Sequence, residues 1–248
     1  MALLAARVPA ALAGAALLAL MESAVPSGAT AASSRPRFDP SSFTSRVDNP
    51  WFPLRPGRTL RYAGEEDGRR GHEVFHVTRR TKTILGVRAT VIHDRVFLGG
   101  RLRENTRDYY AQDRRGNVWY LGEDTEELDA HGKVTTHEGT WRAGRQGARA
   151  GIFMPARPRV GQSFRQERFK GHAEDHFRIV SLHATVDVPA VSTTRAMRTR
   201  EWSPLEPGVR DAKLYVRGIG TVLERTVRGS DERWALVAVR GPGQGGER

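Results

Sequence analysis

The alternation of apolar and polar residues with a period of two most constrains how this chain can fold. It is clearest from Arg178 to Val188. One side carries Val180, Leu182, Ala184, Val186 and Val188, and the other carries Ser181, His183, Thr185 and Asp187, with Ile179 the one apolar residue on the polar side. Successive side chains of a strand point to opposite faces. The segment therefore predicts a strand with one buried face and one face in water.

Turn residues separate further β-rich segments at short intervals. They occur at Asp67-Gly68, Gly99-Gly100, Arg115-Gly116-Asn117, His131-Gly132 and Gly218 to Gly220. Tight turns of this kind join neighbouring antiparallel strands. Trp234 to Val239 is apolar on both faces, which is typical of a central strand. We expect Gly139 to Gly161, rich in glycine and proline, to be an irregular connection. The pattern predicts a mainly β protein, a single antiparallel meander forming a curved sheet, a half-barrel or a β-sandwich.

The N-terminus has the pattern of a secretory signal. Arg7 precedes an apolar run from Val8 to Met21, and Ala29-Thr30-Ala31 is a cleavage site of the signal-peptidase type. The run is too short to span a membrane, and the sequence has no cysteine to carry a lipid or a disulfide. We therefore expect a secreted, extracellular protein. Its parts are a signal peptide (1–31), a flexible leader (32–47), one antiparallel β domain (48–240) and a flexible tail (241–248).

The net charge of +12 raises the question of an anionic partner. Lysine occurs only four times, so 36 of the 40 basic residues are arginine, and these are scattered along the chain and often adjoin an acid. No basic run with interleaved aromatic residues occurs. We expect a solvated basic surface and no nucleic-acid partner, with binding to an anionic cell-envelope polymer as an alternative.

His72-Glu73-Val74-Phe75-His76 matches the zinc-protease pattern H-E-x-x-H. That chemistry requires a helix, which brings the two histidines onto one face about 6 Å apart along its axis. On a strand the same residues lie roughly 13 Å apart. The neighbouring residues favour a strand, so we do not expect a zinc protease.

Two other groups could carry chemistry. His172, Glu174, Asp175 and His176 could bind a metal if they form a loop or a single turn, whereas the simpler interpretation is a polar hairpin end in water. The acidic run from Glu123 to Asp129 follows Trp119-Tyr120 and is otherwise typical of solvated surface. For a glycoside-cleaving carboxylate pair, the candidates are Glu123 or Asp124 with Glu167 or Glu174.

Aromatic residues could form a ligand surface instead of core. If the sheet curls, some of them could line an apolar pocket. The candidate ligand-binding residues are Tyr109, Tyr110, Trp119, Tyr120 and Trp141.

Several motifs together resemble a family of uncharacterised secreted proteins from high-GC bacteria. They are Asn49-Pro50-Trp51-Phe52-Pro53-Leu54-Arg55-Pro56-Gly57, Thr83-Ile84-Leu85-Gly86-Val87, Asp108-Tyr109-Tyr110-Ala111-Gln112-Asp113, Gly116-Asn117-Val118-Trp119-Tyr120, Gly122-Glu123-Asp124-Thr125 and Pro204-Leu205-Glu206-Pro207-Gly208. More loosely, Val180 to Val188 followed by Tyr215 to Gly220 resembles secreted antiparallel-sheet proteins of the LolA-like kind. The first resemblance implies secretion and no particular activity, and the second implies only a fold.

Three functions remain open from the sequence. The first is a non-enzymatic binding or structural protein, monomeric and without a cofactor, that holds an apolar small molecule or lipid in a sheet cleft. The second is a cell-envelope hydrolase using paired carboxylates or a His/Glu/Asp metal site. The third is a surface protein that binds polyanions.

Overall fold

The computed structural model describes residues 36–242, which form fifteen β-strands, one short 3-10 helix and no α-helix. The 3-10 helix is η1 (Pro40–Ser42). The strands are β1 (Thr59–Glu66), β2 (Arg69–Ile84), β3 (Val87–Leu98), β4 (Arg101–Gln112), β5 (Val118–Leu128), β6 (Val134–Thr136), β7 (Trp141–Arg142), β8 (Arg149–Met154), β9 (Ser163–Arg165), β10 (Glu167–Arg168), β11 (His176–Val188), β12 (Val191–Trp202), β13 (Arg210–Val216), β14 (Gly220–Arg228) and β15 (Arg233–Arg240). The expected signal peptide and most of the expected tail lie outside the described residues. Within residues 36–242 no helix has the length and apolar character needed to cross a membrane.

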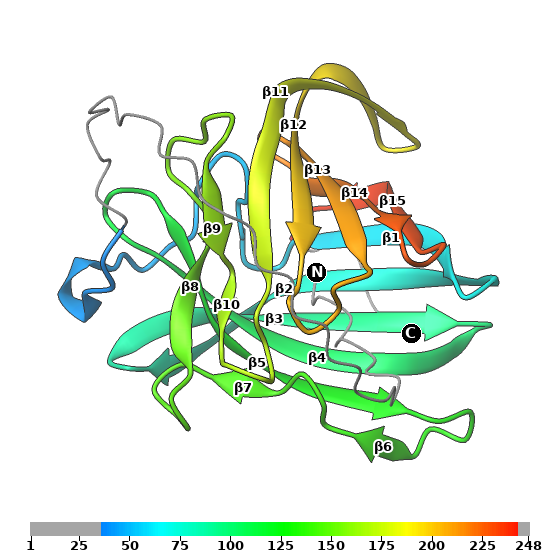
Figure 1. Ribbon diagram of the computed structural model, residues 1–248, viewed down its shortest axis with the longest axis horizontal. Coiled ribbons are helices and arrows are strands. Elements are labelled where there is room, and N and C mark those ends of the chain that lie inside the picture. Colours follow the sequence, from blue (N-terminus) through cyan, green and yellow to red (C-terminus); the bar gives the residue numbers. More distant parts are fainter. Residues whose placement is uncertain (1–35, 243–248) are drawn as a thin grey trace, which may run out of the picture.

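The strands form one antiparallel sheet in which most neighbours follow one another in sequence. The order along the sheet is β10-β8-β5-β4-β3-β2-β1-β15-β14-β13-β12-β11-β9, and β6 and β7 pair with β5. In Figure 1, β11 to β13 run steeply across the direction of β2 to β5, so the sheet curls over itself. The predicted mainly β fold with a curved antiparallel meander is confirmed, and its form is a nearly closed, barrel-like sheet.

One short segment brings the two edges of the sheet together. Ser163 to Arg165 pairs with β11, and after one residue, Gln166, the chain pairs with β8 through Glu167 and Arg168. Gly151 on β8 lies against this segment, because a Cβ built on it would stand 2.1 Å from the Gln166 carbonyl oxygen. Only glycine allows the backbones to approach this closely.

The hairpins occur where the turn residues indicated. Asp67 and Gly68 connect β1 to β2 with φ of 50° and 68°, the left-handed pair required by a two-residue turn that matches strand twist. A further turn, Leu85-Gly86, joins β2 to β3 with φ of 51° and 77°. The expected irregular connection from Gly139 to Gly161 contains two strands, β7 and β8.

The alternation in β11 differs from the prediction. Phe177 and Ile179 are buried in its first half, whereas Val186 and Val188 are buried in its second half. The register with β12 shifts at several points from Ile179 to Val186. Such an irregularity moves the buried face by one residue. Ile179 is therefore a core residue, and the prediction that it faces the polar side is wrong.

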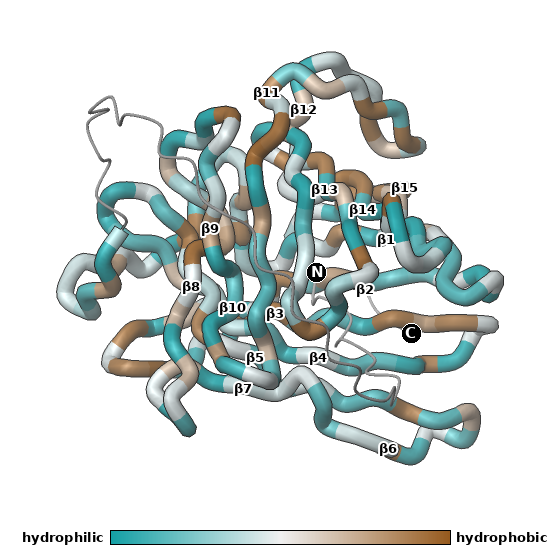
Figure 2. Tube along the Cα trace, in the orientation of Figure 1, coloured by the Kyte–Doolittle hydropathy of each residue, from teal (hydrophilic) through white to brown (hydrophobic). Residues whose placement is uncertain are grey.

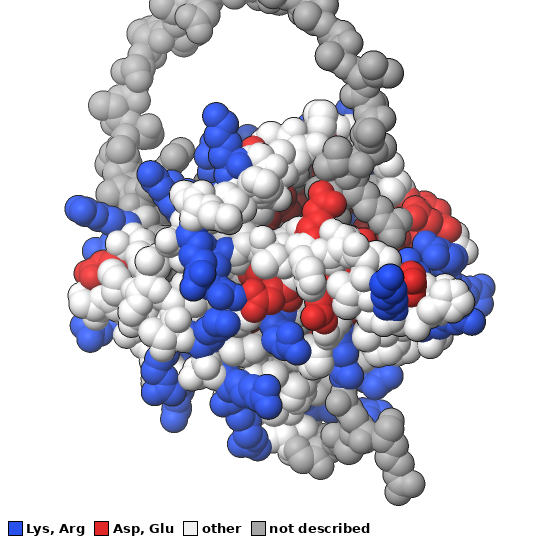
Figure 3. Space-filling view, turned by 90° about the horizontal axis from the view of Figure 1, so that it is seen from below, with Lys and Arg blue, Asp and Glu red and all other residues white. Residues whose placement is uncertain are grey.

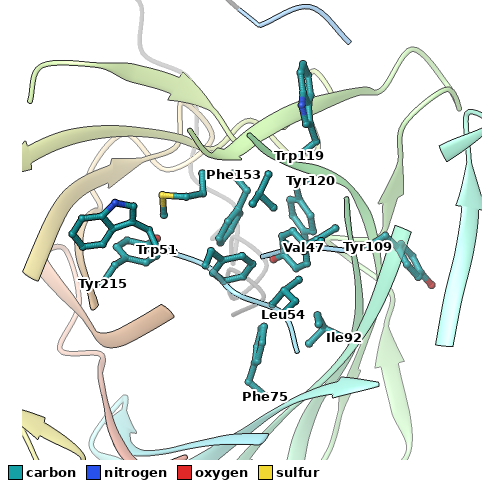
Figure 4. Packing of buried hydrophobic residues seen from close by; sticks show 14 of the residues in the cluster. Val47, Trp51, Leu54, Phe75, Ile92, Tyr109, Trp119, Tyr120, Phe153 and Tyr215 are labelled. Carbon is teal, nitrogen blue, oxygen red and sulfur yellow. The ribbon is translucent and has the colours of Figure 1, made fainter. Parts of the chain in front are cut away.

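The N-terminal segment fills part of the interior of the curled sheet. Phe52 packs against Phe75, Tyr110 and Phe153 at ring-centroid distances of 6.1, 5.2 and 4.5 Å. Figure 4 shows Val47, Leu54 and Phe153 among the interior side chains. Apolar residues are spread over both crossing layers of strands (Figure 2).

The described part of the expected leader is also packed. Phe38 and Phe43 lie against the Trp119 ring with centroids 5.4 and 6.1 Å apart, and Phe43 bridges to Asp113. We expected the β domain to begin at Asp48 after a flexible leader. The packed structure begins earlier, because the Phe38 and Phe43 side chains hold this segment on the outer face of β5.

Candidate functional site

Buried carboxyl side chains line the inner face of the sheet. We call these eight residues the interior carboxyl group. They are Glu73 (β2), Asp94 (β3), Glu104 and Asp108 (β4), Glu123 (β5), Glu167 (β10), Glu201 (β12) and Glu224 (β14), each less than 8% exposed. The buried basic side chains among residues 36–242 are Lys213 and Arg58. Acidic groups therefore greatly outnumber basic ones inside the protein.

Alternation along β4 explains how acids reach the interior. Glu104, Thr106, Asp108 and Tyr110 occupy every second position and are all buried. Residues directly opposite in an antiparallel pair share a face. Asp108 stands opposite Glu123 of β5, so two carboxyl groups face the same interior space.

The Tyr120 hydroxyl connects these two carboxyl groups. It donates a hydrogen bond to Asp108 Oδ1 at 2.6 Å, and Glu123 Oε2 lies 3.0 Å from the same oxygen. A phenol has one proton to donate. Since Tyr120 gives that proton to Asp108, a favourable contact with Glu123 requires Glu123 to be protonated and to donate in turn. Hydrogen bonds therefore run from Glu123 to Tyr120 and from Tyr120 to Asp108. Glu123 is protonated in this chain of hydrogen bonds, so the pair of acids holds one proton more than two carboxylates would.

Burial acts on these acids in the same direction. Burial raises the pKa of Asp108 to about 6. The pKa of Glu123 is raised well above its usual range by burial and by the charges of Glu167 and Asp108. The pKa of Glu167 is also raised, by burial and by Asp175. Removing a carboxylate from water disfavours its charged form, and a second carboxylate nearby adds to the effect.

Lys213 forms the second centre of the interior. Its Nζ lies 3.3 Å from Glu201 Oε2 and 3.3 Å from Glu224 Oε1, and its side chain is fully buried. Burial lowers the pKa of Lys213, but Glu201 and Glu224 outweigh it and hold the pKa above its ordinary value. Burial raises the pKa of Glu224 to about 8, although Lys213 opposes this. One lysine thus pairs with two carboxyl groups, so the acidic groups outnumber the basic ones around Lys213 as well.

Two polar atoms beside the chain from Glu123 to Asp108 have no hydrogen-bond partner among the described residues. They are Asp108 Oδ2 and Tyr110 Oη, whereas the Trp141 side chain hydrogen-bonds to the Glu167 carboxyl group. A buried polar atom without a partner costs about 1–3 kcal/mol. Their side chains are at most 4% exposed. The group therefore presents both donors and acceptors that a bound molecule could satisfy.

The candidate aromatic residues divide between the two faces of the sheet. Tyr110 and Tyr120 stack at 4.6 Å, and Trp141 meets Tyr120 edge-on at 5.4 Å, all on the inner face. Trp119 and Tyr109 point away from the interior (Figure 4). Trp119 donates to Asp113 Oδ2, and Tyr109 donates to Asp124 Oδ2. Only three of the five candidates thus lie together.

The candidate acids divide in the same way. Glu123 and Glu167 are both in the interior carboxyl group, and the charge of Glu167 raises the pKa of Glu123. Asp124 lies on the opposite face of β5, where it pairs with Arg142 and where Lys82 Nζ stands 3.9 Å away. Glu174 is only half-buried, and the structure does not place it with Glu123.

The histidine cluster does not converge on one point. His172 stacks on Phe169 at 4.3 Å, and His176 packs against Trp202 at 5.4 Å. Asp175 is turned toward Ser203 and Lys213, and burial raises its pKa to about 7. In residues 36–242 no three His, Asp or Glu side chains are arranged to hold a metal ion.

The H-E-x-x-H segment lies on β2, as its neighbours indicated. His72 stacks on Phe97, while His76 accepts or donates a hydrogen bond with Thr59 Oγ1 at 2.8 Å. Glu73, between them, faces inward opposite Tyr62, and burial and Asp94 raise its pKa. The histidines and the glutamate are therefore on opposite faces.

Six members of the interior carboxyl group were not among the sequence candidates. They are Glu73, Asp94, Glu104, Asp108, Glu201 and Glu224. The available signal was that acids share one alternating face of a strand with an aromatic residue, as Glu104 and Asp108 do with Tyr110 in β4. A polar alternate face is normally assigned to solvent, so this signal alone did not identify them.

Comparisons with known proteins leave the family open. No protein-family model matches the chain, and no curated protein matches it. A solved structure from Bacteroides fragilis, described as an exported protein with a YmcC-like fold, has a TM-score of 0.46 and 12% identity, covering 77% of this chain and 99% of that one. Another, described as a lipoprotein from Parabacteroides distasonis, has a TM-score of 0.43 and 9% identity, covering 77% and 98%.

Proposed function

We propose that this protein is an exported binding protein whose ligand is an organic cation held at the interior carboxyl group. Export is supported by the Arg7, Val8 to Met21 and Ala29 to Ala31 pattern of a secretory signal. Binding is supported by the burial of eight carboxyl groups, against two buried basic side chains, Lys213 and Arg58, in residues 36–242. That single imbalance of charge carries the proposal.

A bound cation would offset the free-energy cost of burying carboxylates that have no basic partner. A buried carboxylate is costly unless it is paired, so in the free protein such groups keep their protons. An ammonium or guanidinium group placed near Asp108 and Glu123 would favour their ionised forms. The ligand's charge would then be met by strong, charge-assisted hydrogen bonds.

The surroundings also favour a ligand with a flat apolar part. Tyr110, Tyr120 and Trp141 lie next to Asp108 and Glu123. Aromatic faces attract both cations and other rings. This modifies the expectation of a purely apolar ligand, because a neutral lipid would leave the carboxyl groups without a partner.

The test begins with native mass spectrometry of the mature protein purified from its own secretion medium, which identifies any retained organic mass. Binding is then measured at pH 8 with tryptamine and with tryptophol, which differ in having an ammonium or a hydroxyl group. We expect a retained amine or guanidine, and at least about tenfold tighter binding of tryptamine, about 1.4 kcal/mol. Equal affinities, or no binding and no retained mass, would contradict the proposal.

A hydrolase using Glu123 and Glu167 is the second candidate. It is favoured by one observation: burial raises the pKa of both acids, and the charge of Glu167 raises the pKa of Glu123 further. A carboxyl group that keeps its proton near neutral pH can act as a general acid. Glu167→Gln separates the two functions. A hydrolase loses turnover of an envelope glycan by about a hundredfold or more, whereas a binding protein shows no turnover before or after the change.

A further inference from the structure

A second charged site lies on the outer surface and is basic. A cavity of about 640 Å³ is lined by four arginines and no acidic residue. The arginines are Arg114, Arg115, Arg157 and Arg159, and the rest of the lining is uncharged: Pro36, Asn117, Pro155, Ala156, Gln162, Ser163 and Phe164. A volume of this size holds a small organic molecule.

The four arginines come from two loops that the fold ties together. Asn117 Oδ1 accepts from the Ala156 backbone N–H at 2.9 Å, and Asn49 Nδ2 donates to the carbonyls of Gly116 and Pro155 at 2.8 and 3.2 Å. Both asparagines are buried. The loop after β4 and the loop after β8 therefore form one frame, and the positions of the arginine backbones are fixed before any ligand arrives.

Both carboxylate oxygens of Asp113, the buried acid in the loop after β4, already accept hydrogen bonds from within that loop and from Trp119. Asp113 Oδ1 accepts from the backbone N–H groups of Arg115 and Asn117, and its Oδ2 accepts from Asn117 Nδ2 and Trp119 Nε1. Asp113 thus shapes the loop without pairing with a guanidinium group. Among residues 36–242, no ion pair of 4.0 Å or less joins any of the four arginines to a carboxylate, although Arg114 is near enough to Asp39 to help lower its pKa.

We infer that this cavity is a binding site for a multiply charged oxyanion, distinct from the interior carboxyl group. Guanidinium groups present paired N–H donors that match the oxygens of phosphates and carboxylates. Four of them around one cavity exceed what a single monoanion requires. The ligand is therefore a molecule with two or more phosphoryl or carboxylate groups.

The charge distribution of the whole chain agrees with such a site. Burial of the interior carboxyl group removes acidic side chains from the surface and leaves the arginines outside. Figure 3 shows one face over which Lys and Arg side chains are widely spread, with Asp and Glu side chains between them. Long-range attraction would thus increase the rate at which an anion reaches the protein.

The experiment is calorimetric titration of the full mature protein with tripolyphosphate and with citrate, at low and at physiological salt. We expect at least one of them to bind with a 1:1 stoichiometry, and the tighter of the two identifies phosphoryl or carboxylate recognition. The paired changes Arg115→Ala with Arg157→Ala should weaken binding by at least tenfold. Since both side chains are exposed, the variant should melt within a few degrees of the unchanged protein.

Arg225→Ala with Arg228→Ala is the matched control. It removes the same charge from exposed positions on β14, and Arg225 faces another arginine, Arg233, across the sheet. We expect less than a threefold loss of anion affinity for this pair. An equal loss in both double variants, or no binding of either anion to the unchanged protein at millimolar concentration, would overturn the inference. Glu123→Gln should leave anion binding unchanged, so this result is independent of the proposed cation site.

Discussion

At the scale of residues, the unusual feature is a tyrosine shared by two acids. Tyr120 lies within hydrogen-bond distance of both Asp108 and Glu123, so the three groups must hold a proton that a carboxylate pair would lack. The neighbouring residue, Asp124, has a different situation because it is partly exposed and paired with Arg142. Adjacent acids thus have opposite roles, since successive residues of a strand face opposite ways.

The first prediction compares these neighbours. Glu123→Gln keeps the shape and supplies a permanent N–H donor without a titrating group. We expect it to raise the free energy of unfolding at pH 8 by about 1 kcal/mol and to change it little at pH 5. Asp124→Asn should instead lower stability slightly, by about 0.5 kcal/mol, because it removes a partly exposed ion pair. Urea unfolding at both pH values measures the difference, and equal effects of the two changes would contradict the assignment of faces.

The second prediction concerns the buried lysine. Lys213→Met leaves Glu201 and Glu224 next to each other without their shared cation. Breaking a buried ion pair costs about 3–5 kcal/mol. We expect a loss of about 3 kcal/mol in urea unfolding at pH 8, and partial recovery when Glu224→Gln is added. If the second change brings no recovery, Lys213 stabilises the fold through something other than these two acids.

At the scale of elements, the join between the sheet edges depends on one glycine. Gly151 has no room for a Cβ because the carbonyl oxygens of Gln166 and Arg165 would lie 2.1 and 2.4 Å from it. The segment from Ser163 to Arg168 pairs with β8 on one side and with β11 on the other. Any separation at Gly151 would therefore open the sheet beside Glu167.

The third prediction tests this join. Gly151→Ala should lower the free energy of unfolding by about 2 kcal/mol or more, because the backbones must separate. Hydrogen exchange should speed up first in β8, β9 and β10. Gly208→Ala is the control, since a Cβ there meets nothing within 4 Å. A Gly151 variant as stable as the Gly208 variant would refute the close approach.

The strands themselves could be predicted from the sequence, but their register and their pairing could not. Strands and hairpins were predictable because alternation and turn residues act locally, and the turn at Asp67-Gly68 and the central strand at Trp234 followed from them. The buried side of β11 was not, because shifts of register with β12 depend on the partner strand. The meeting of Arg115 with Arg157 was not predictable either, since it depends on the pairing of β5 with β8.

The candidate site was predictable only in part for a related reason. Glu123 was a candidate because it follows Trp119-Tyr120 in an acidic run of a basic chain, and Tyr120 and Trp141 were candidates because aromatic residues could line a pocket if the sheet curls. Asp108 and Glu224 were not candidates, since an acid alternating with other residues normally indicates a solvent-facing side. Only the curling of the sheet places that side inside.

At the scale of the molecule, charge is sorted between inside and outside. Within residues 36–242, most buried charged side chains are acidic, whereas almost all arginines are at least partly exposed. Two buried and two half-buried acids have a pKa raised chiefly by desolvation, to about 6 for Asp108 and about 8 for Glu224, and to about 7 for Asp175 and Glu232. The folded state therefore keeps protons that the unfolded chain releases near pH 4.

The fourth prediction is that stability falls as pH rises. Between about pH 4 and pH 8 the folded protein binds more protons than the unfolded chain, so the free energy of unfolding decreases with pH. The stabilising contribution is complete below pH 4 and is lost as pH passes through about 6 to 8. We expect the melting temperature at pH 8 to be roughly 5–10 °C below that at pH 5. A melting temperature that rises over this interval would contradict the protonated interior.

The central claim is that protonated interior acids ionise when an organic cation binds. Calorimetric titration of the mature protein with tryptamine at pH 6.5, in two buffers of different ionisation enthalpy, measures the protons released. We predict release of about one proton or more per bound tryptamine, and none with tryptophol or with the Glu123→Gln variant. Binding of tryptamine without proton release, or with the same release in that variant, would contradict the account.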